Sequence, residues 1–583
     1  MYLIIKKYFS KIVLALLVFS FVFANEQTFT QRNKPNLRPS NCCRALSFSL
    51  EDLPAPPLMT GIGSSKLEIT TKSQKAQDYF NQGLNLLHCF WEFEAYRAFK
   101  EASRLDNKCA MAYWGMATAL PESQTYQNKK EELLKKANGL SKDISEHEQL
   151  YIEAYQKLAT LSGSEATEAF NEKMEILIDR YPQDNDAKLF YAWSITSGYK
   201  LNGQPKEDTL FAQQLVENVL LKDPNSAAAN HYWIHVMESG HPERALEAAN
   251  KLPKLAPNSG HIVHMPGHIY YQLGEYEKAR QAFLASREVD KAYMEEQQIP
   301  PIDTWNYIHN LDYLIANCLE DGRYKEGLAY AKESQEILLS DKQIKALHAG
   351  ASRILYISKT ASAKLCIRYG KWIEAIKSLE QLIKQPQISI YAEKYYKGLL
   401  AYVEGRQELE SNNLVQANVR LTELDSILWQ LSKQMDKPNG APEERFSEAM
   451  EILEIMALEL RGLVLSYKNQ HIQAIELLKT ASEKEQELGY SEPPQYVRPV
   501  WESLAQVYLR ADKWQQAKEA YEAELKARPN NGHALYGIAQ VLAAIGKKKE
   551  ATLAYQRFLQ AWQNADPDLS QINKAKIWLQ NVS

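Results

Sequence analysis

The segment "WESLAQVYLRADKWQQAKEAYEAELKARP" (residues 501–529) decides the fold. Its large and small apolar residues follow one spacing, W-x2-L-A-x2-Y, then A-x3-Y, then P. Equivalent residues return 34 positions later, at Leu535, Ile538, Ala539, Leu542, Ala551 and Tyr555. Because small residues let the two helices of a hairpin approach and large residues fill the space between hairpins, this spacing predicts helical hairpins stacked in a row.

Earlier parts of the chain carry the same spacing. The matching positions are Gly83, Ala95 and Phe99, then Gly240, Ala245 and Pro257, then Gly267, Tyr270, Gly274, Ala279 and Phe283. The spacing resembles that of the tetratricopeptide repeat. We therefore predict an all-α, right-handed, tetratricopeptide-type solenoid. It has an N-terminal array (residues 73–432) and a C-terminal array (residues 445–583), separated by the linker "KQMDKPNGAPEE" (residues 433–444).

The first residues are typical of an export signal. Lys6, Lys7 and Lys11 precede the apolar run "IVLALLVFSFVFA", which ends at Ala24 with small residues at the cleavage positions. This pattern predicts a signal peptide over residues 1–24, followed by a Pro- and Ser-rich extension over residues 25–72. We expect an exported protein, periplasmic or extracellular, with no integral membrane segment after cleavage. An uncleaved N-terminal anchor is the alternative.

Charge and cysteine content limit the classes of binding partner and the disulfide bonds that we expect. The net charge is -4, and the absence of a strongly basic balance argues against a nucleic-acid partner. Export would permit disulfides, and Cys42 or Cys43 could pair with Cys89 or Cys109. Cys318 and Cys366 are expected to be buried as small apolar residues.

Histidines gather in "SGHIVHMPGHIYYQLGEYEKA" (residues 259–279) around a helix-breaking pair, Pro266 and Gly267. With about 100° per residue, His261, His264 and His268 share a helix face roughly 60° wide. Repeat spacing places them on the concave side of the solenoid. Gly267 occupies a position that needs a small residue, whereas Pro266 costs a helix interior about 3 kcal/mol. A broken local rule of this kind favours a functional site.

Neighbouring repeats add further candidate ligands. We predict a transition-metal site formed by His261, His264, His268 and His309, with His231, His235, Glu238, Asp312 and Glu92 as additional candidates. Repeat counting places His309 and Asp312 in the same groove, and places His231 and His235 one residue out of register at its edge. Imidazole ligands suit zinc, copper or iron. HExxH, HxxEH and GxSxG motifs are absent from the sequence, so the hydrolases that they mark are not indicated.

The N-terminal array also resembles a group of exported bacterial tetratricopeptide proteins. The resemblance lies in "NQGLNLLHCFWEFEAYRAFKEASRLD", "CAMAYWGMA", "HYWIHVMESGHPERAL", "GHIVHMPGHIYYQLGEYEKA" and "YIHNLDYL", across roughly residues 75–315. It implies the fold and export, but no reaction.

Three hypotheses about function follow from these patterns. The first is a binding or scaffold protein whose histidine-lined concave pocket holds a transition metal and binds a peptide, protein segment or small ligand, with a protein-binding groove in the C-terminal repeats. The second is a metalloenzyme with a zinc, copper or iron centre in the groove. In the third, the histidines form only a structural hydrogen-bond cluster.

Overall fold

The computed structural model describes residues 54–121, 124–200, 203–337, 354–385, 388, 390–435 and 444–582. Helices and their connecting loops make up these residues, which contain no β-strand and one isolated bridge between Tyr199 and Pro205. The prediction of an all-α solenoid is therefore confirmed.

Successive helices pack as hairpins along the chain. The N-terminal hairpins comprise α2 (Gln74–His88), α3 (Glu92–Leu105), α4 (Ala110–Thr118), α5 (Gln124–Gly139), α6 (Glu146–Thr160), α7 (Gly163–Arg180), α8 (Asn185–Ile195) and α9 (Glu207–Lys222). The central hairpins comprise α10 (Ala227–Glu238), α11 (Leu246–Leu255), α12 (Gly260–Gln272), α13 (Tyr276–Gln297), α14 (Trp305–Asp321) and α15 (Tyr324–Gln335).

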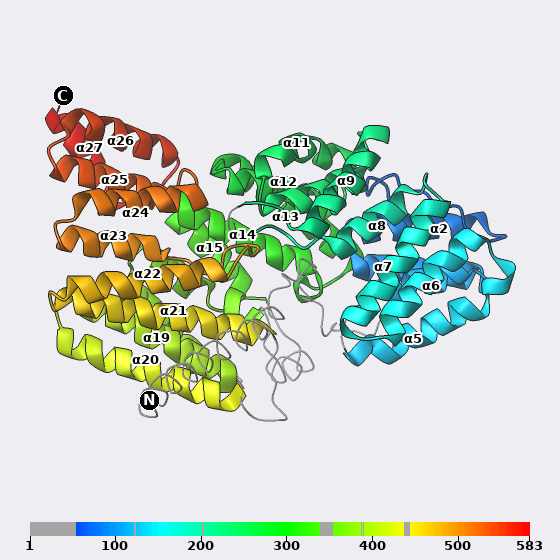
Figure 1. Ribbon diagram of the computed structural model, residues 1–583, viewed down its shortest axis with the longest axis horizontal. Coiled ribbons are helices and arrows are strands. Elements are labelled where there is room, and N and C mark those ends of the chain that lie inside the picture. Colours follow the sequence, from blue (N-terminus) through cyan, green and yellow to red (C-terminus); the bar gives the residue numbers. More distant parts are fainter. Residues whose placement is uncertain are drawn as a thin grey trace, which may run out of the picture.

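The C-terminal part continues the same pattern (Figure 1). It comprises α17 (Ala361–Arg368), α18 (Trp372–Ile383), α19 (Ile390–Glu410), α20 (Leu414–Met435), α21 (Glu444–Tyr467), α22 (His471–Glu487), α23 (Val500–Arg510), α24 (Trp514–Ala527), α25 (Gly532–Ala544), α26 (Lys548–Ala561) and α27 (Ser570–Val582). Short helical turns cover Ser141–Asp143, Pro242–Ala245, Pro301–Asp303 and Ile354–Ser358.

Small residues allow the close helix contacts that the repeat spacing predicts. A Cβ atom on Gly267 would lie 2.2 Å from a ring carbon of Phe283, and one on Gly83 would lie 2.6 Å from a ring carbon of Phe99. These contacts join the two helices of a hairpin, α12 to α13 and α2 to α3. Glycine at these positions makes room for the aromatic ring of the second helix.

Helix α12 runs through Pro266 without a break. The sequence marks Pro266 and Gly267 as a helix breaker, but both are buried within this one helix. Ser259 caps the start of α12, its hydroxyl accepting from the backbone N–H of Ile262. Packing against α10, α13 and α14 offsets the hydrogen bond that proline cannot make.

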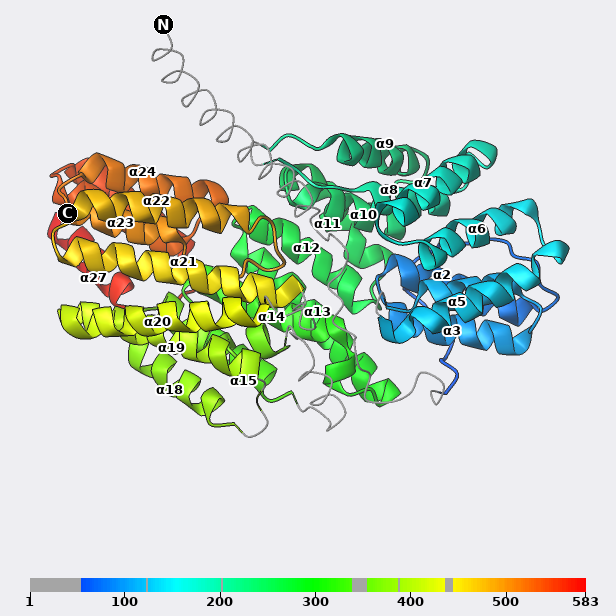
Figure 2. The same cartoon turned by 60° about the horizontal axis from the view of Figure 1, so that its bottom comes forward.

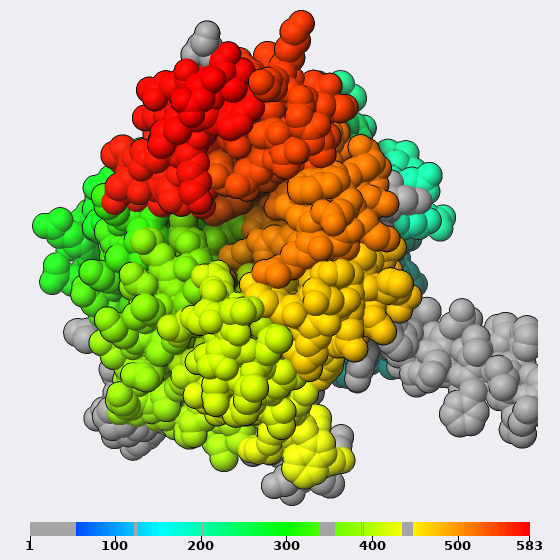
Figure 3. Space-filling model, turned by 90° about the vertical axis from the view of Figure 1, so that its left-hand side faces the viewer, coloured from blue at the N-terminus to red at the C-terminus, as the bar shows by residue number. Residues whose placement is uncertain are grey.

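The C-terminal hairpins turn back and pack against the middle of the chain (Figures 1 and 2). Figure 3 shows the red C-terminal helices in contact with green helices of the central hairpins. Glu320 in α14 joins the two parts. Its carboxylate accepts from Asn531 and, at 2.9 Å, from Arg528, and its backbone carbonyl accepts from the Trp562 indole at 2.8 Å. The last repeats are thus fastened to the central ones.

Several sequence expectations fall on parts of the chain with limited description. Residues 1–53, which contain the predicted signal peptide, Cys42 and Cys43, lie outside the described residues, as do residues 436–443 of the predicted linker. Helices α20 and α21, on either side of that segment, pack against each other. Cys89, Cys109, Cys318 and Cys366 are free, buried thiols. Within the described part, none of the helices is both long and apolar enough to span a membrane.

Candidate metal centre

Six histidines lie close together in the interior, on the first helices of three successive hairpins. Helix α10 supplies two of them, α12 supplies three and α14 supplies one: His231, His235, His261, His264, His268 and His309. Each side chain is at most 6 % exposed. The histidines form two groups of three, each with its ligand nitrogens within 4.8 Å of one another.

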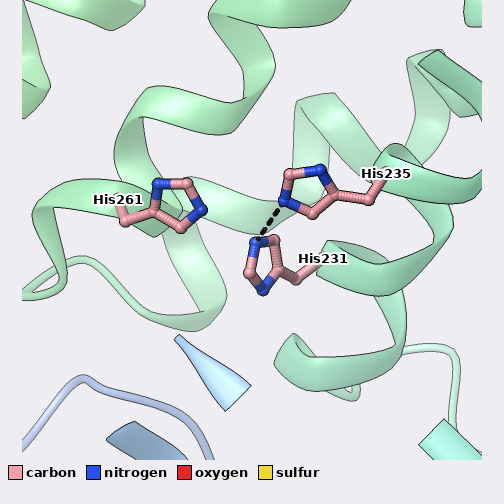
Figure 4. A group of neighbouring side chains, drawn as sticks. All are labelled: His231, His235 and His261. Atoms are coloured by element: carbon pink, nitrogen blue, oxygen red, sulfur yellow. Dashed lines mark hydrogen bonds between the residues drawn. The ribbon is translucent and has the colours of Figure 1, made fainter. Parts of the chain in front are cut away.

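The first group, here called triad A, consists of His231, His235 and His261. Figure 4 shows the three rings with one nitrogen each turned toward a common point between α10 and α12. The Nε2 atoms of His231 and His235 approach to 3.1 Å. Nε2 of His261 is buried and has no hydrogen-bond partner among the described residues.

Oxygen acceptors fix the orientation of the triad A rings. Nδ1 of His231 donates to the backbone carbonyl of His88 at 2.6 Å, and Nδ1 of His235 donates to Glu238 at 2.7 Å. Nδ1 of His261 lies 3.2 Å from Oδ1 of Asn306, whose amide nitrogen donates to Asp290. Because each Nδ1 faces an oxygen acceptor, the three Nε2 atoms are left to face one another.

The second group, triad B, consists of His264, His268 and His309 and has the same design. The Nε2 atoms of His264 and His268 approach to 2.8 Å. Nδ1 of His264 donates to Oδ1 of Asn310 at 2.6 Å, and Nδ1 of His268 donates to Glu238 at 2.6 Å. The ring of His309 completes the group, 4.8 Å from the His264 ring between centroids.

Glu238 connects the two triads. One carboxylate oxygen accepts from His235 of triad A and the other accepts from His268 of triad B. Burial alone would raise the pKa of Glu238, but the two imidazoles outweigh it and hold the pKa well below its usual range. Glu238 is therefore an ionised acceptor that fixes the tautomer of one histidine in each triad.

Burial also sets the charge of the imidazoles. Desolvation, reinforced by the neighbouring histidines, holds the pKa of His231, His261 and His264 well below its ordinary value. These rings are neutral near pH 7, which is the form that binds metal ions.

Aromatic side chains pack around the histidines. Phe90 lies 5.2 Å from the His235 ring, Trp305 lies 4.9 Å from the His261 ring, and Tyr313 lies 4.4 Å from the His268 ring, between centroids. A cavity of about 10 Å³, bordered by His261, Asp290 and other residues, adjoins triad A. Burial raises the pKa of Asp290 to about 7.

The arrangement has the chemistry of a metal centre. Two lone pairs that face each other at 3.1 Å and 2.8 Å repel unless a metal ion or a shared proton lies between them. Two imidazole nitrogens bound to one tetrahedral zinc ion are separated by about 3.3 Å, given zinc–nitrogen bonds of about 2.0–2.1 Å. Each triad therefore offers a set of three ligand nitrogens for one ion.

The structure groups the predicted ligands differently from the sequence analysis. His264, His268 and His309 come together, but His261 joins His231 and His235, because it lies one turn earlier on α12, opposite α10. Asp312 and Glu92 belong to none of the potential metal-binding groups in the described part of the chain. The histidines are buried between helices, so they do not line an open concave groove.

Sequence reasoning misplaced two contributors to the site and missed others. His231 and His235, placed at the groove edge by repeat counting, are central members of triad A. Asn306 and Asn310, which orient two rings, are separated by four residues on α14, and that helical spacing was an available signal. Glu492, which forms a third group with His235 and Glu238, is distant in sequence and gave no signal.

Comparison with known families identifies only part of the chain. Residues 503–566 match the tetratricopeptide repeat model. The C-terminal hairpins contain tetratricopeptide repeats. None of the curated protein sequences compared with this chain matches it.

Solved structures show only distant likeness. A human IFIT1 dimer with m7Gppp-AAAA is 14% identical with a TM-score of 0.30, and the match covers 85% of this chain and 92% of that one. Yeast Tom70 is 12% identical with a TM-score of 0.27, covering 88% and 96%. The APC/C hetero-tetramer Cut9–Hcn1 is 14% identical with a TM-score of 0.23, covering 75% and 96%. Scores this low carry no argument about activity or partners.

Proposed function

We propose that this helical-repeat protein binds transition-metal ions, one in triad A and one in triad B. The observation that carries the proposal is the pair of close Nε2 contacts, His231 with His235 and His264 with His268, in rings whose Nδ1 atoms face acceptors. A purely structural cluster would need a shared proton in each contact. The lowered pKa of His231 and of His264 keeps that proton off these two rings, so His235 and His268 would have to carry it, and metal analysis separates this case from a bound ion.

The donor set favours zinc or copper. Each triad offers three imidazole nitrogens, which both metals accept. Iron sites of the facial-triad type also use a carboxylate, and the nearby Glu238 is instead hydrogen-bonded to His235 and His268.

Metal analysis of the purified full-length protein tests the proposal. After incubation with Zn²⁺, Cu²⁺ or Fe²⁺ and removal of excess metal, we expect two ions per chain. His235→Ala and His264→Ala should each lose one ion, whereas the surface variant His241→Ala should keep both. A folded wild-type protein that stays free of all three metals, or unchanged stoichiometry in both triad variants, would refute metal binding.

A metalloenzyme is the second candidate, favoured by the ligand count. Three protein ligands leave a tetrahedral ion one open position, as in catalytic zinc sites, and the 10 Å³ cavity beside His261 has room for about one water molecule. Metal-loaded protein should then hydrolyse 4-nitrophenyl acetate faster than the metal-free protein and faster than loaded His235→Ala. Equal rates in all three samples would reject this hydrolytic activity.

The C-terminal repeats are proposed to bind a protein segment or peptide. A cavity of about 250 Å³ lies between α19, α21 and α23, bordered by Arg406, Tyr467, Gln506 and Arg510 among others. Arg510→Glu should abolish capture of a partner that the wild-type protein retains from its native extract. Capture that is equally strong with the variant would reject this groove.

Export is proposed from residues 1–24. Cell fractionation should find the protein outside the cytoplasm with Asn25 at its N-terminus, and a cytoplasmic full-length chain would contradict export.

A further inference from the structure

The loop between α22 and α23 (residues 488–499) extends from the C-terminal repeats toward the central helices (Figure 1). Its C-terminal end is held by the repeats that carry it. The Tyr496 hydroxyl donates to Glu459 at 2.7 Å, the Val500 N–H donates to Glu485 at 2.7 Å, and Arg528 donates to the carbonyl of Tyr496 at 2.7 Å.

Glu492 of this loop lies at the histidine cluster. Its carboxylate, a ligand nitrogen of His235 and a carboxylate oxygen of Glu238 all lie within 4.8 Å of one another. Tyr313 lies beside it: burial raises the pKa of the Tyr313 hydroxyl, and the Glu492 charge adds to this shift. The Tyr313 ring in turn contacts His268 of triad B.

Charge explains why a second carboxylate occurs there. Two carboxylates this close repel each other when both are ionised, and a cation between them removes that repulsion. Two divalent ions would add about four positive charges to this interior. Buried charge is costly without compensation. Glu238 and Glu492 are carboxylates placed where they can offset part of that charge.

We propose that Glu492 supplies a carboxylate to the metal centre and that its loop closes the centre, so that an ion leaves only after the loop moves. The inference rests on the proposed metal binding at the two triads. It adds a carboxylate from the C-terminal repeats to a site built by central helices. Metal occupancy and the position of this loop are thereby coupled.

Release of metal to a chelator tests the inference in the full-length protein. We would load wild-type protein, Glu492→Gln and the control Glu487→Gln with Zn²⁺, add excess 4-(2-pyridylazo)resorcinol, and follow the absorbance of the zinc complex. Glu487 is an exposed residue at the end of α22. We expect Glu492→Gln to release zinc about 10- to 100-fold faster than the other two proteins. Release at the wild-type rate from folded Glu492→Gln would overturn the inference.

Hydrogen exchange gives a second readout that separates the two proposals. Zinc should slow amide exchange in residues 488–499 of the wild-type protein, and Glu492→Gln should lose this protection while its circular dichroism stays unchanged. If wild-type protein binds zinc without any change in loop exchange, loop closure is wrong although metal binding stands. If wild-type protein binds no zinc at all, the proposed function itself fails.

Discussion

Replacing Glu238 by glutamine should weaken one metal site and spare the other. The two carboxylate oxygens of Glu238 accept from Nδ1 of His235 and from Nδ1 of His268, at 2.7 Å and 2.6 Å. Glutamine keeps the shape but has only one acceptor oxygen, and its amide nitrogen must face the other ring. That ring then carries its proton on Nε2, the nitrogen that points to the metal.

The size of the effect follows from the role of Glu238 as an orienting group. Loss of such a partner lowers metal affinity about 10- to 100-fold, which corresponds to about 1.4–2.7 kcal/mol. The loss should fall on the triad whose histidine faces the amide nitrogen, because the other histidine keeps its acceptor. Glu238→Gln should therefore bind one ion tightly and a second weakly.

A competition titration with a chromogenic chelator, together with metal analysis, measures both affinities. Glu243→Gln is the matched control, since Glu243 accepts from His241 at 3.3 Å on the protein surface. It should bind two ions like the wild-type protein. If folded Glu238→Gln also binds two ions with wild-type affinities, Glu238 does not orient the ligands and the reasoning fails.

Three further predictions concern stability and pH. Gly267→Ala should lower the free energy of unfolding by about 1–3 kcal/mol, because the new Cβ would lie 2.2 Å from Phe283. Denaturant unfolding measures this loss, and it should show none for Gly139→Ala, whose Cβ would enter open space. Arg368→Ala should lower the free energy of unfolding by about 3–5 kcal/mol in the same assay, because it leaves Glu502, 2.5 Å from Arg368, buried without its counter-charge. A loss as small as that of the surface variant Arg104→Ala would contradict this. Because the pKa of His231 and of His264 is held well below 6.5, these rings stay neutral in the folded chain while unfolded histidines protonate near pH 6.5. We therefore expect these two histidines to lower the free energy of unfolding as pH falls below about 6.5. Bound metal should persist at pH 6 in equilibrium dialysis, and complete metal loss at pH 6.5 would contradict this.

The fold was predictable because its determinants are local and periodic. The pairs Gly83 with Phe99 and Gly267 with Phe283 have the same separation, and each records a contact between neighbouring helices of one hairpin. Contacts of this kind recur along the sequence and can be counted. The return of the last repeats onto Glu320 could not be predicted, since it depends on the summed rotation of many hairpins.

The site was predictable only where helix geometry alone decides it. His264 and His268 are separated by four residues on α12 and must be neighbours. The division into two triads depends on the rotation of α10 about its axis, which repeat counting placed one residue out of register. Glu492 approaches through a loop far along the chain, and no local pattern marks it.

The junction at Glu320 changes how this chain should unfold. In an open row of repeats, the terminal unit has neighbours on one side only and frays first. Here α25 and the end of α26 contact α14 through Asn531 and Trp562, so opening the C-terminal end also breaks contacts in the middle of the molecule. The C-terminal repeats and the central helices should then unfold in one cooperative transition, which includes the helices that hold the histidines.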